Sequence, residues 1–438
     1  MHVFLLFSDE KVTLKFQNMY VKSIILLCLL GFCQLSHAKY GFRGEQEWGF
    51  VTVRPGAHMF YWLHYTTANV SSFTEKPLII WLEGGPGLSS TGYTNFKEIG
   101  PFYLNLTSRP HTLIKDYNIL FIDSPVGTGF SYADSDNAYP KTNEQVAKDL
   151  ISFTEEFFKN FPILSNVPTY IVGQSYGGKI APIFAYEWLK KIESGWNITN
   201  LKGIGLSSAW ASPVHNVLSM GPYLCENGLI NANDTKMIED CAFKANISSS
   251  MKDWRAAALN MLKTLAEIQN CKKNLNFYNI FSEVDHENYS PYDEDEPKVQ
   301  HLMNTIVKSA LKLPETSNFH IDTKPNDEYL YEQTMKPVTK KVEYLLAQPN
   351  FKVFVFNGKL DLLVNPKGTF HWVENLTWKN SSKWLEARKK QLIINKSIEG
   401  YVKAFENLRM YWVNRAGHLI AVDNPVATRK ILKDLTSD

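Results

Sequence analysis

The chain has 438 residues, of which 44% are hydrophobic and 21% are charged, with 46 Lys and Arg residues against 44 Asp and Glu residues. An aromatic content of 13% excludes a disordered or fibrous chain, because such chains lack the apolar side chains that build a core. The formal net charge of +2 provides no basic field, so we expect no nucleic-acid partner.

Residues 1–38 are predicted to be a signal peptide. Lys22 precedes an apolar run at 24–32, and the small residues Ser36 and Ala38 follow at the two positions that a signal peptidase reads. The run is much shorter than the roughly 20 residues that cross a bilayer, so we expect no membrane anchor. The alternative is a buried core helix. Cleavage after Ala38 would send the protein through the secretory pathway, to the outside of the cell or to the lysosome.

Cysteine and asparagine residues fit that compartment. Three cysteines follow the predicted signal peptide, Cys225, Cys241 and Cys271, which allows one disulfide bond with one free thiol, or no disulfide bond. Nine asparagines stand in Asn-x-Ser/Thr sequences and are candidate glycosylation sites on the protein surface. They are Asn69, Asn105, Asn197, Asn233, Asn246, Asn288, Asn375, Asn380 and Asn395.

Residues 39–211 are predicted to form the first part of an α/β core. Short apolar runs ended by turn residues indicate buried strands, whereas apolar residues on a 3.6-residue period indicate helices. Asn143 is the expected N-cap of the first of these helices. In chain order the expected elements are strands at 77–82 and 117–123, a helix at 143–159, a strand at 169–172, a helix at 180–191 and a strand at 201–206.

The pattern then changes. Residues 212–341 are richer in polar and charged side chains and favour a mainly helical insertion, or cap. Residues 342–438 are predicted to form the second part of the core. Strand patterns return there at 351–357 and 408–413, and a helix is expected near the C-terminus. This order predicts the α/β class, with a mostly parallel central sheet and a helical cap insertion.

A Gly-x-Ser-x-Gly sequence at 173–177 stands between an expected strand and an expected helix. A tight turn there would lift the hydroxyl of Ser175 above the sheet, at a helix N-terminus whose backbone N–H groups favour anionic oxygen. Ser175 is therefore the candidate nucleophile. The alternative is a glycine-rich turn that only packs against the sheet.

An activated serine needs a base, and the base needs a carboxylate that orients it. In this architecture they are expected in the order Ser, Asp, His, each after a later strand. Asp361 follows the expected strand at 351–357, and His418 follows the one at 408–413. Each alone would be an ordinary turn aspartate or structural histidine. With Ser175 they match the required order, so we expect a catalytic triad.

The oxyanion of an acyl-transfer reaction needs preorganised donors. One is expected at the backbone N–H of Tyr176, directly after the candidate nucleophile, and another in a glycine-rich loop after an early strand. Gly84, Gly85 and Gly87 form such a loop, in which glycine lets the backbone approach closely. The sequence contains no metal-ligand spacing and no phosphate-binding glycine motif after a strand, so we expect no metal and no cofactor.

Several longer motifs resemble those of the serine carboxypeptidase family. They are Trp-Leu-Glu-Gly-Gly-Pro-Gly-Leu-Ser-Ser at 81–90, Asp-Ser-Pro-Val-Gly-Thr-Gly-Phe-Ser-Tyr at 123–132, Ser-Tyr-Gly-Gly-Lys at 175–179 and Ala-Gly-His at 416–418. Further stretches at 100–101, 208–213 and 357–361 are most similar to the retinoid-inducible, or vitellogenic-like, branch. The resemblance runs from about Gly49 to the C-terminus.

The resemblance implies an α/β-hydrolase fold and the release of C-terminal amino acids from peptides through an acyl-enzyme, usually at acid pH. The partner is then the C-terminus of a peptide or protein. The same resemblance assigns Ser175, Asp361 and His418 to the triad, and the N–H groups of Gly85 and Tyr176 to the oxyanion hole. Two other functions remain open: an acyltransferase or esterase with the same triad, and a non-catalytic glycoprotein that keeps the fold.

The predicted site for the substrate carboxylate departs from the family pattern. The resemblance places Glu83, Glu98 and Gln174 there, but the family usually has an amide where Glu83 stands and a Glu where Gln174 stands. Leu88 and residues 419–421 also differ. If Glu83 and Gln174 touch, the acid–amide pair survives with its members exchanged, and Gln174 or a protonated glutamate can donate to the substrate. The alternative is a drift toward another acyl substrate.

Overall fold

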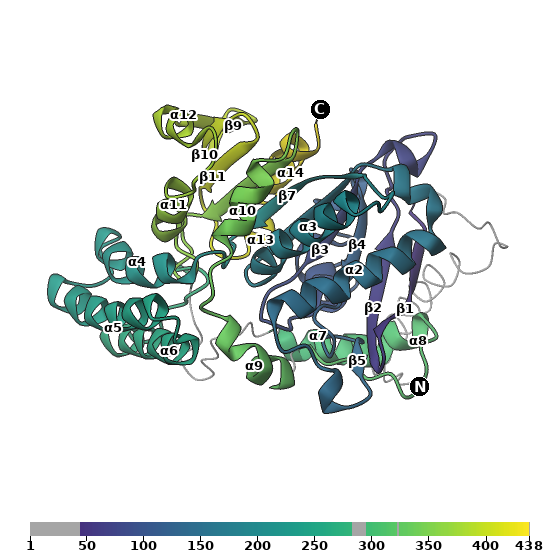
Figure 1. Cartoon of the computed structure of the whole chain (residues 1–438), viewed down its shortest axis with the longest axis horizontal. Coiled ribbons are helices and arrows are strands. Elements are labelled where there is room, and N and C mark those ends of the chain that lie inside the picture. The colour runs from purple at the N-terminus through teal and green to yellow at the C-terminus, as the bar shows by residue number, and fades with distance from the viewer. Residues whose placement is uncertain (1–43, 283–294, 322–323, 438) are drawn as a thin grey trace, which may run out of the picture.

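A computed structural model describes residues 44–282, 295–321 and 324–437 (Figure 1). The predicted signal peptide and the candidate glycosylation site Asn288 lie outside the described residues. All structural statements below concern the described part of the chain.

One mixed sheet of eleven strands runs through the described residues. Its strands are β1 (Gln46–Arg54), β2 (Ala57–His64), β3 (Leu78–Leu82), β4 (Asn118–Ile122), β5 (Tyr132–Ala133), β6 (Thr169–Gln174), β7 (Leu201–Ser207), β8 (Lys352–Gly358), β9 (Lys390–Ile394), β10 (Ser397–Phe405) and β11 (Leu408–Val413). The order across the sheet is β1-β2-β4-β3-β6-β7-β8-β11-β10-β9, and β5 pairs with β2. Strands β4, β3, β6, β7, β8 and β11 pair in parallel, whereas the outer strands pair antiparallel. The predicted α/β fold with a mostly parallel sheet is confirmed.

Helices connect and cover these strands. The α-helices are α2 (Asn143–Asn160), α3 (Gly177–Glu193), α4 (Pro213–Glu226), α5 (Ala232–Ser250), α6 (Trp254–Cys271), α7 (Glu296–Leu302), α8 (Lys308–Ala310), α9 (Lys324–Leu330), α10 (Thr339–Leu346), α11 (Pro366–Glu374), α12 (Ser381–Glu386), α13 (Ile420–Asp423) and α14 (Pro425–Thr436). Two π-helices are η2 (Ser90–Ile99) and η6 (Met303–Val307). Short 3₁₀ segments are η1 (Phe73–Glu75), η3 (Leu113–Lys115), η4 (Asp136–Ala138), η5 (Pro162–Asn166) and η7 (Tyr331–Gln333).

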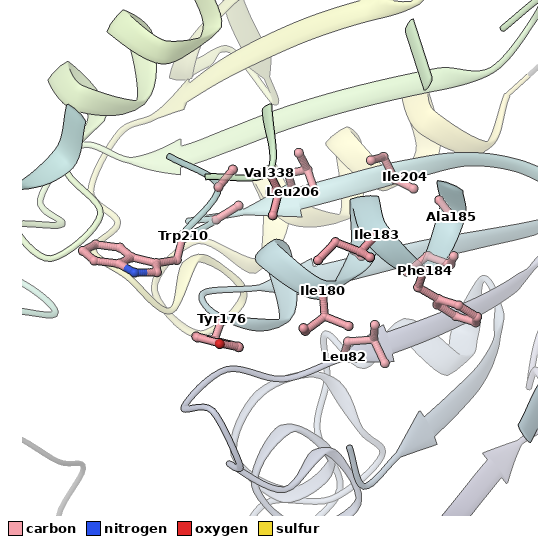
Figure 2. Packing of buried hydrophobic residues seen from close by; sticks show 14 of the residues in the cluster. Leu82, Tyr176, Ile180, Ile183, Phe184, Ala185, Ile204, Leu206, Trp210 and Val338 are labelled. Carbon is pink, nitrogen blue, oxygen red and sulfur yellow. The ribbon is translucent and has the colours of Figure 1, made fainter. Parts of the chain in front are cut away.

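The apolar runs of the parallel strands are continuous because both faces of the sheet are covered. Successive side chains of a strand point to opposite faces. In β3, Leu78 and Ile80 belong to the cluster packed with α2 and α3, whereas Ile79 and Trp81 belong to the cluster packed with α14. Figure 2 shows side chains of α3, β3 and β7 meeting in the first cluster. Because helices pack on both faces of the sheet, the strand ends that carry the candidate site are held in place.

One predicted helix start is wrong by one residue. The side chain of Thr142 accepts the backbone N–H of Gln145, so Thr142 is the N-cap of α2 and Asn143 is already its first helical residue. Asn143 instead accepts a hydrogen bond from the hydroxyl of Tyr176, 2.7 Å away. The second helix, α3, begins at Gly177, earlier than its apolar period predicts, because glycines open it.

The described helices between β7 and β8 lie in separate places, and α10 packs against α3 of the core. Helices α4, α5 and α6 form a lobe at one end of the molecule, whereas α7 and α8 lie beside β1, β2 and β5 (Figure 1). There Val299 and Met303 pack with Phe60 and Trp62 of β2. The indole of Trp48 also donates to the carbonyl of Leu311, 3.0 Å away. This segment therefore closes the face of the β1–β2 hairpin.

Candidate active site

Ser175 stands in a tight turn between a strand and a helix. β6 ends at Gln174 and α3 begins at Gly177, and Ser175 has φ +54°, a left-handed conformation that is strained for a residue with a side chain. A Cβ on Gly177 would lie 2.2 Å from the carbonyl oxygen of Leu82, so only glycine fits there. The backbone N–H of Ser175 donates to the carbonyl of Ser207, 3.0 Å away. The predicted strand–turn–helix is present, with Ser175 at its apex.

Asp361 and His418 meet at the same edge of the sheet. The Nδ1 atom of His418 lies 2.8 Å from Oδ2 of Asp361, and both side chains are buried. The other carboxylate oxygen of Asp361 accepts the N–H of Val364 at 2.8 Å, which fixes the orientation of the carboxylate. A Cβ on Gly358 would lie 2.0 Å from the carbonyl oxygen of Gly417, so glycine lets the two loops touch. The carboxylate is placed to orient the imidazole.

The far nitrogen of His418 is not engaged. Its Nε2 is buried and makes no hydrogen bond to any residue that the structure describes, Ser175 included. The imidazole ring packs edge-on against the ring of Tyr278, with 4.9 Å between the ring centroids. The backbone N–H of His418 donates to the backbone carbonyl of Tyr278 at 2.6 Å. A histidine whose Nε2 is uncommitted can accept a proton. The hydrogen bond between a catalytic base and its nucleophile often forms or shortens only when the substrate binds.

The glycine-rich loop lies directly against the serine turn. A Cβ on Gly84 would lie 2.7 Å from Cβ of Ser175 and 3.3 Å from the backbone nitrogen of Tyr176. Within the described part of the chain, the backbone N–H groups of Gly85 and Tyr176 donate no hydrogen bond. Two uncommitted backbone donors beside a serine hydroxyl can bind a developing oxyanion.

Glu83, Glu98 and Gln174 are brought together beside this loop. Nε2 of Gln174 donates to Oε1 of Glu83 at 3.1 Å, and to both carboxylate oxygens of Glu98 at 2.9 and 3.1 Å. All three side chains are buried. The exchanged acid and amide therefore touch. However, the amide N–H₂ points to the two carboxyls, and the Oε1 atom of Gln174 has no hydrogen-bond partner among the described residues.

The two carboxyls differ in their surroundings. Burial raises the pKa of Glu98 well above the usual range, and the charge of Glu83 raises it further, against weaker opposite effects of Gln174 and Arg109. Glu83 instead accepts hydrogen bonds, from Thr94 at 2.6 Å and from the N–H of Gly84 at 2.9 Å. Glu98 is therefore the carboxyl that can act as a hydrogen-bond donor, whereas Glu83 accepts the hydrogen bonds of its neighbours.

A family model described as serine carboxypeptidase matches residues 37–438. The chain belongs to this family. It is 35% identical to the retinoid-inducible serine carboxypeptidase of Mus musculus, over 94% of this chain and 96% of that protein. It is 30% identical to the vitellogenic carboxypeptidase of Aedes aegypti, over 87% of this chain and 81% of the relative.

The fold matches a solved member of this group. The crystal structure of the prohormone-processing carboxypeptidase Kex1 from Saccharomyces cerevisiae superposes with a TM-score of 0.78 at 24% identity, covering 90% of this chain and 91% of that one. The predicted α/β-hydrolase fold and membership of the serine carboxypeptidases are confirmed.

Sequence reasoning missed the element that holds the carboxyls of this family member. The π-helix η2 presents Ser90, Thr94 and Glu98, four residues apart, toward Glu83. Ser90 Oγ accepts the backbone N–H of Glu83 at 3.2 Å, Thr94 donates to its carboxylate, and Glu98 shares its amide partner Gln174. The four-residue spacing could have indicated one shared helical face. π-Helical turns are rare and are frequently found at functional sites.

A second missed residue, Asp123, fixes the loop before η2. Its buried carboxylate accepts hydrogen bonds from Ser89 Oγ at 2.6 Å, from Thr91 Oγ1 at 2.7 Å and from the N–H groups of Thr91 and Phe130 at 3.0 Å. Burial raises the pKa of Asp123 to about 6, and these four donors act in the opposite direction. Asp123 thereby joins the end of β4 to the glycine-rich loop, a structural role inside the family motif at 123–132.

The other predicted features lie away from this carboxypeptidase site. The thiols of Cys225, Cys241 and Cys271 are not joined in the structure. Among the described residues no helix is long and apolar enough to cross a bilayer, and no group of three or more metal-ligating side chains is found. Six candidate glycosylation sites are exposed: Asn69, Asn105, Asn197, Asn233, Asn375 and Asn395; Asn246 and Asn380 are half-buried.

Proposed function

We propose that the protein is a serine carboxypeptidase in which Ser175 attacks the last peptide bond of its substrate. His418 Nε2 takes the hydroxyl proton as the Oγ–carbon bond forms, and Asp361 stabilises the resulting imidazolium. The imidazolium then gives that proton to the departing amino acid, and water hydrolyses the acyl-enzyme by the same route. The 2.8 Å contact between Asp361 and His418, at the sheet edge that carries the left-handed serine turn, is the observation that supports this assignment.

The N–H groups of Gly85 and Tyr176 are proposed to bind the oxyanion. Both are uncommitted within the described structure, and Gly84 packs against the serine side chain, so the loop is already in position. Preorganised donors of this kind typically lower the barrier by about 3–4 kcal/mol each.

The substrate carboxylate is proposed to bind beside Glu83, Glu98 and Gln174. Because the Gln174 N–H₂ is engaged by the two glutamates, the donor available to a substrate is a carboxyl that keeps its proton. The raised pKa of Glu98 supports this role, since burial keeps its proton on to higher pH. Binding of a free C-terminus should therefore weaken as pH rises through the titration of Glu98.

The test compares a peptide that has a free C-terminus with its C-terminal amide. Ser175→Ala should fold but lose turnover by about 10⁴- to 10⁶-fold and lose labelling by a fluorophosphonate. Ser309→Ala, which removes an exposed hydroxyl on α8, is the matched control and should behave as wild type. Undiminished turnover in purified Ser175→Ala would contradict the assignment.

One observation favours a second candidate, an acyltransferase or esterase. The exchange of Glu83 and Gln174 leaves the amide N–H₂ facing the glutamates instead of a substrate. If the peptide with a free C-terminus and its C-terminal amide are cleaved equally well at every pH, these residues do not bind the substrate carboxylate. The acyltransferase or esterase function is then favoured.

We also propose that the protein is a secreted or lysosomal glycoprotein whose signal peptide ends at Ala38. The exposure of most described acceptor asparagines supports glycosylation, because an oligosaccharide needs a solvent-facing side chain. N-terminal sequencing should give Lys39, and a glycosidase that removes N-linked glycans should lower the mass. A retained Met1 would refute cleavage, and an unchanged mass would refute glycosylation.

A further inference from the structure

A second concave surface lies at the edge of the sheet opposite to the serine turn. Its walls include Pro77, Tyr117, Pro168 and Lys352, which stand at the start of β3, β4, β6 and β8, whereas Ser175 follows the end of β6. The groove encloses about 1800 Å³. Its lining residues include some on α12 and α14, which lie near the C-terminus and away from α5, α6 and α9 in Figure 1.

The two surfaces are far apart. β6 has six residues and separates them, and a strand of that length spans about 20 Å. A ligand in the groove would not touch Ser175. Its function is therefore independent of the proposed peptidase chemistry.

The groove carries a concentrated positive charge in a nearly neutral protein. Nine Lys and Arg side chains and three carboxylates line it, although the whole chain has a net charge of only +2. A concave surface lined by one sign of charge focuses the field and attracts a ligand of the opposite sign. The rest of the protein must carry a compensating negative excess, so the groove is more basic than the remainder of the chain taken together.

Several of these cations have no acidic partner. Lys379 and Lys383, on either side of the start of α12, and Lys433 near the end of α14 are exposed, and no carboxylate of a described residue lies within ion-pair distance of them. Three others are paired: Arg429 with Asp116, with 2.8 Å between Nη2 and Oδ1, and both Arg409 and Lys430 with Asp434. Unpaired lysines give up no internal ion pair when they bind an external anion, which favours binding.

We propose that this groove binds a linear sulfated polysaccharide. Such a chain offers closely spaced anionic groups in a shape that can enter a concavity, whereas a flat bilayer surface would meet mainly the rims. The aromatic residues of the walls, Tyr117, Tyr170 and Phe354, are buried, so they present no ring faces on which nucleic-acid bases could stack. The charge and the shape together select a flexible anionic chain.

The test measures binding of heparin, used as the sulfated probe, to the full glycosylated protein over a range of NaCl concentrations. The triple variant Lys379→Gln, Lys383→Gln, Lys433→Gln should raise the Kd at least tenfold. For nucleic acids the slope of log K against log salt changes by about 0.7–0.9 for each phosphate that the protein neutralises, and heparin binding releases counterions in the same way, so removal of three cations should lower the slope by about 2–3. Peptidase turnover should be unchanged in this variant.

A matched control removes the same charge elsewhere. Lys236, Lys244 and Lys263 are exposed on α5 and α6, and their triple Gln variant should bind heparin as wild type does. Equal weakening in both variants would mean non-specific attraction and would overturn the proposal. Failure to bind heparin, with binding of phosphatidylserine vesicles or single-stranded DNA instead, would also overturn it.

The protein's own glycans provide the last comparison. Asn380 and Asn395, two candidate glycosylation sites, line the same groove. Heparin binding that appears only after enzymatic removal of N-glycans would mean that those glycans fill the groove, and would overturn the proposal for the native protein. Equal binding before and after removal would support it.

Discussion

Gln174 separates two buried carboxyls, so Gln174→Glu is the sharpest test of the arrangement around it. The amide nitrogen lies 2.9–3.1 Å from oxygens of Glu83 and Glu98. A glutamate in its place would put a third carboxyl at that separation, with almost no change in shape. We therefore expect a loss of stability that depends on pH and not on packing.

The size of this loss follows from two competing costs. Two unit charges about 3 Å apart repel by about 5.5 kcal/mol at an effective dielectric constant of about 20. Protonation of the new carboxyl instead costs about 1.4 kcal/mol for each pH unit above an ordinary glutamate pKa of about 4.3, or about 3.7 kcal/mol at pH 7. Protonation is the cheaper course. The variant should therefore lose up to about 3.7 kcal/mol at pH 7 and almost nothing at pH 4.

Urea unfolding at pH 4, 5.5 and 7 measures this dependence. The introduced carboxyl has a higher pKa in the folded state than in the unfolded state. It therefore costs little stability below the unfolded pKa and more as pH rises above it. The difference between variant and wild type in the free energy of unfolding should grow with pH. Gln174→Met, which removes the donors without adding a charge, should lose stability with a weaker dependence on pH, because it removes only the hydrogen bonds that favour ionised Glu98. The double variant Glu83→Gln, Gln174→Glu should recover most of the loss at pH 7. Equal destabilisation by Gln174→Glu at pH 4 and pH 7 would refute the reasoning.

Three other positions allow predictions. Gly84→Ala would place a Cβ 2.7 Å from that of Ser175, so turnover should fall on the order of 100-fold, whereas Gly49→Ala, whose Cβ would meet its nearest atoms at 3.4 Å, should keep wild-type turnover. Burial lowers the pKa of His64 to about 3, so stability should decline as pH falls below about 6.5, by about 2.7 kcal/mol at pH 4.5. His64→Gln should abolish that decline in urea unfolding; persistence of the decline would contradict it. Burial also lowers the pKa of Lys179 well below its usual range, so stability should rise with pH, and an unchanged slope in Lys179→Met would exclude Lys179 as its source.

The parallel strands could be predicted because each is an apolar run that ends in turn residues. The runs at 77–82, 117–123 and 201–206 differ by at most one residue at each end from the observed strands β3, β4 and β7. The β1–β2 hairpin was missed even though Pro55-Gly56 separates two strand-like runs. The antiparallel strands β9 and β10 are half exposed, so their hydrophobic pattern is weaker.

The candidate site could be predicted only where chemistry requires a fixed residue type after a strand. Ser175, Asp361 and His418 satisfy that requirement, and family motifs added Glu83, Glu98 and Gln174. Tyr278 could not be found in this way, because it lies in the loop after α6 and follows no strand. It contacts His418 through its ring and through its backbone carbonyl. Nor could the sequence indicate which way the Gln174 amide points, since that depends on the protonation of its neighbours.

The packing of residues 295–321 against the β1–β2 hairpin has a consequence for synthesis. Phe60 and Trp62 find their partners Val299 and Met303 only after most of the chain has been made, and the Trp48–Leu311 hydrogen bond spans 263 residues. At translation rates of about 5–20 residues per second, the hairpin waits roughly 15–50 s with this apolar face open. During that interval the nascent chain presents a surface that chaperones bind and that promotes aggregation. Destabilising changes in α7 should therefore reduce the yield of secreted protein before they change the properties of the molecules that do fold.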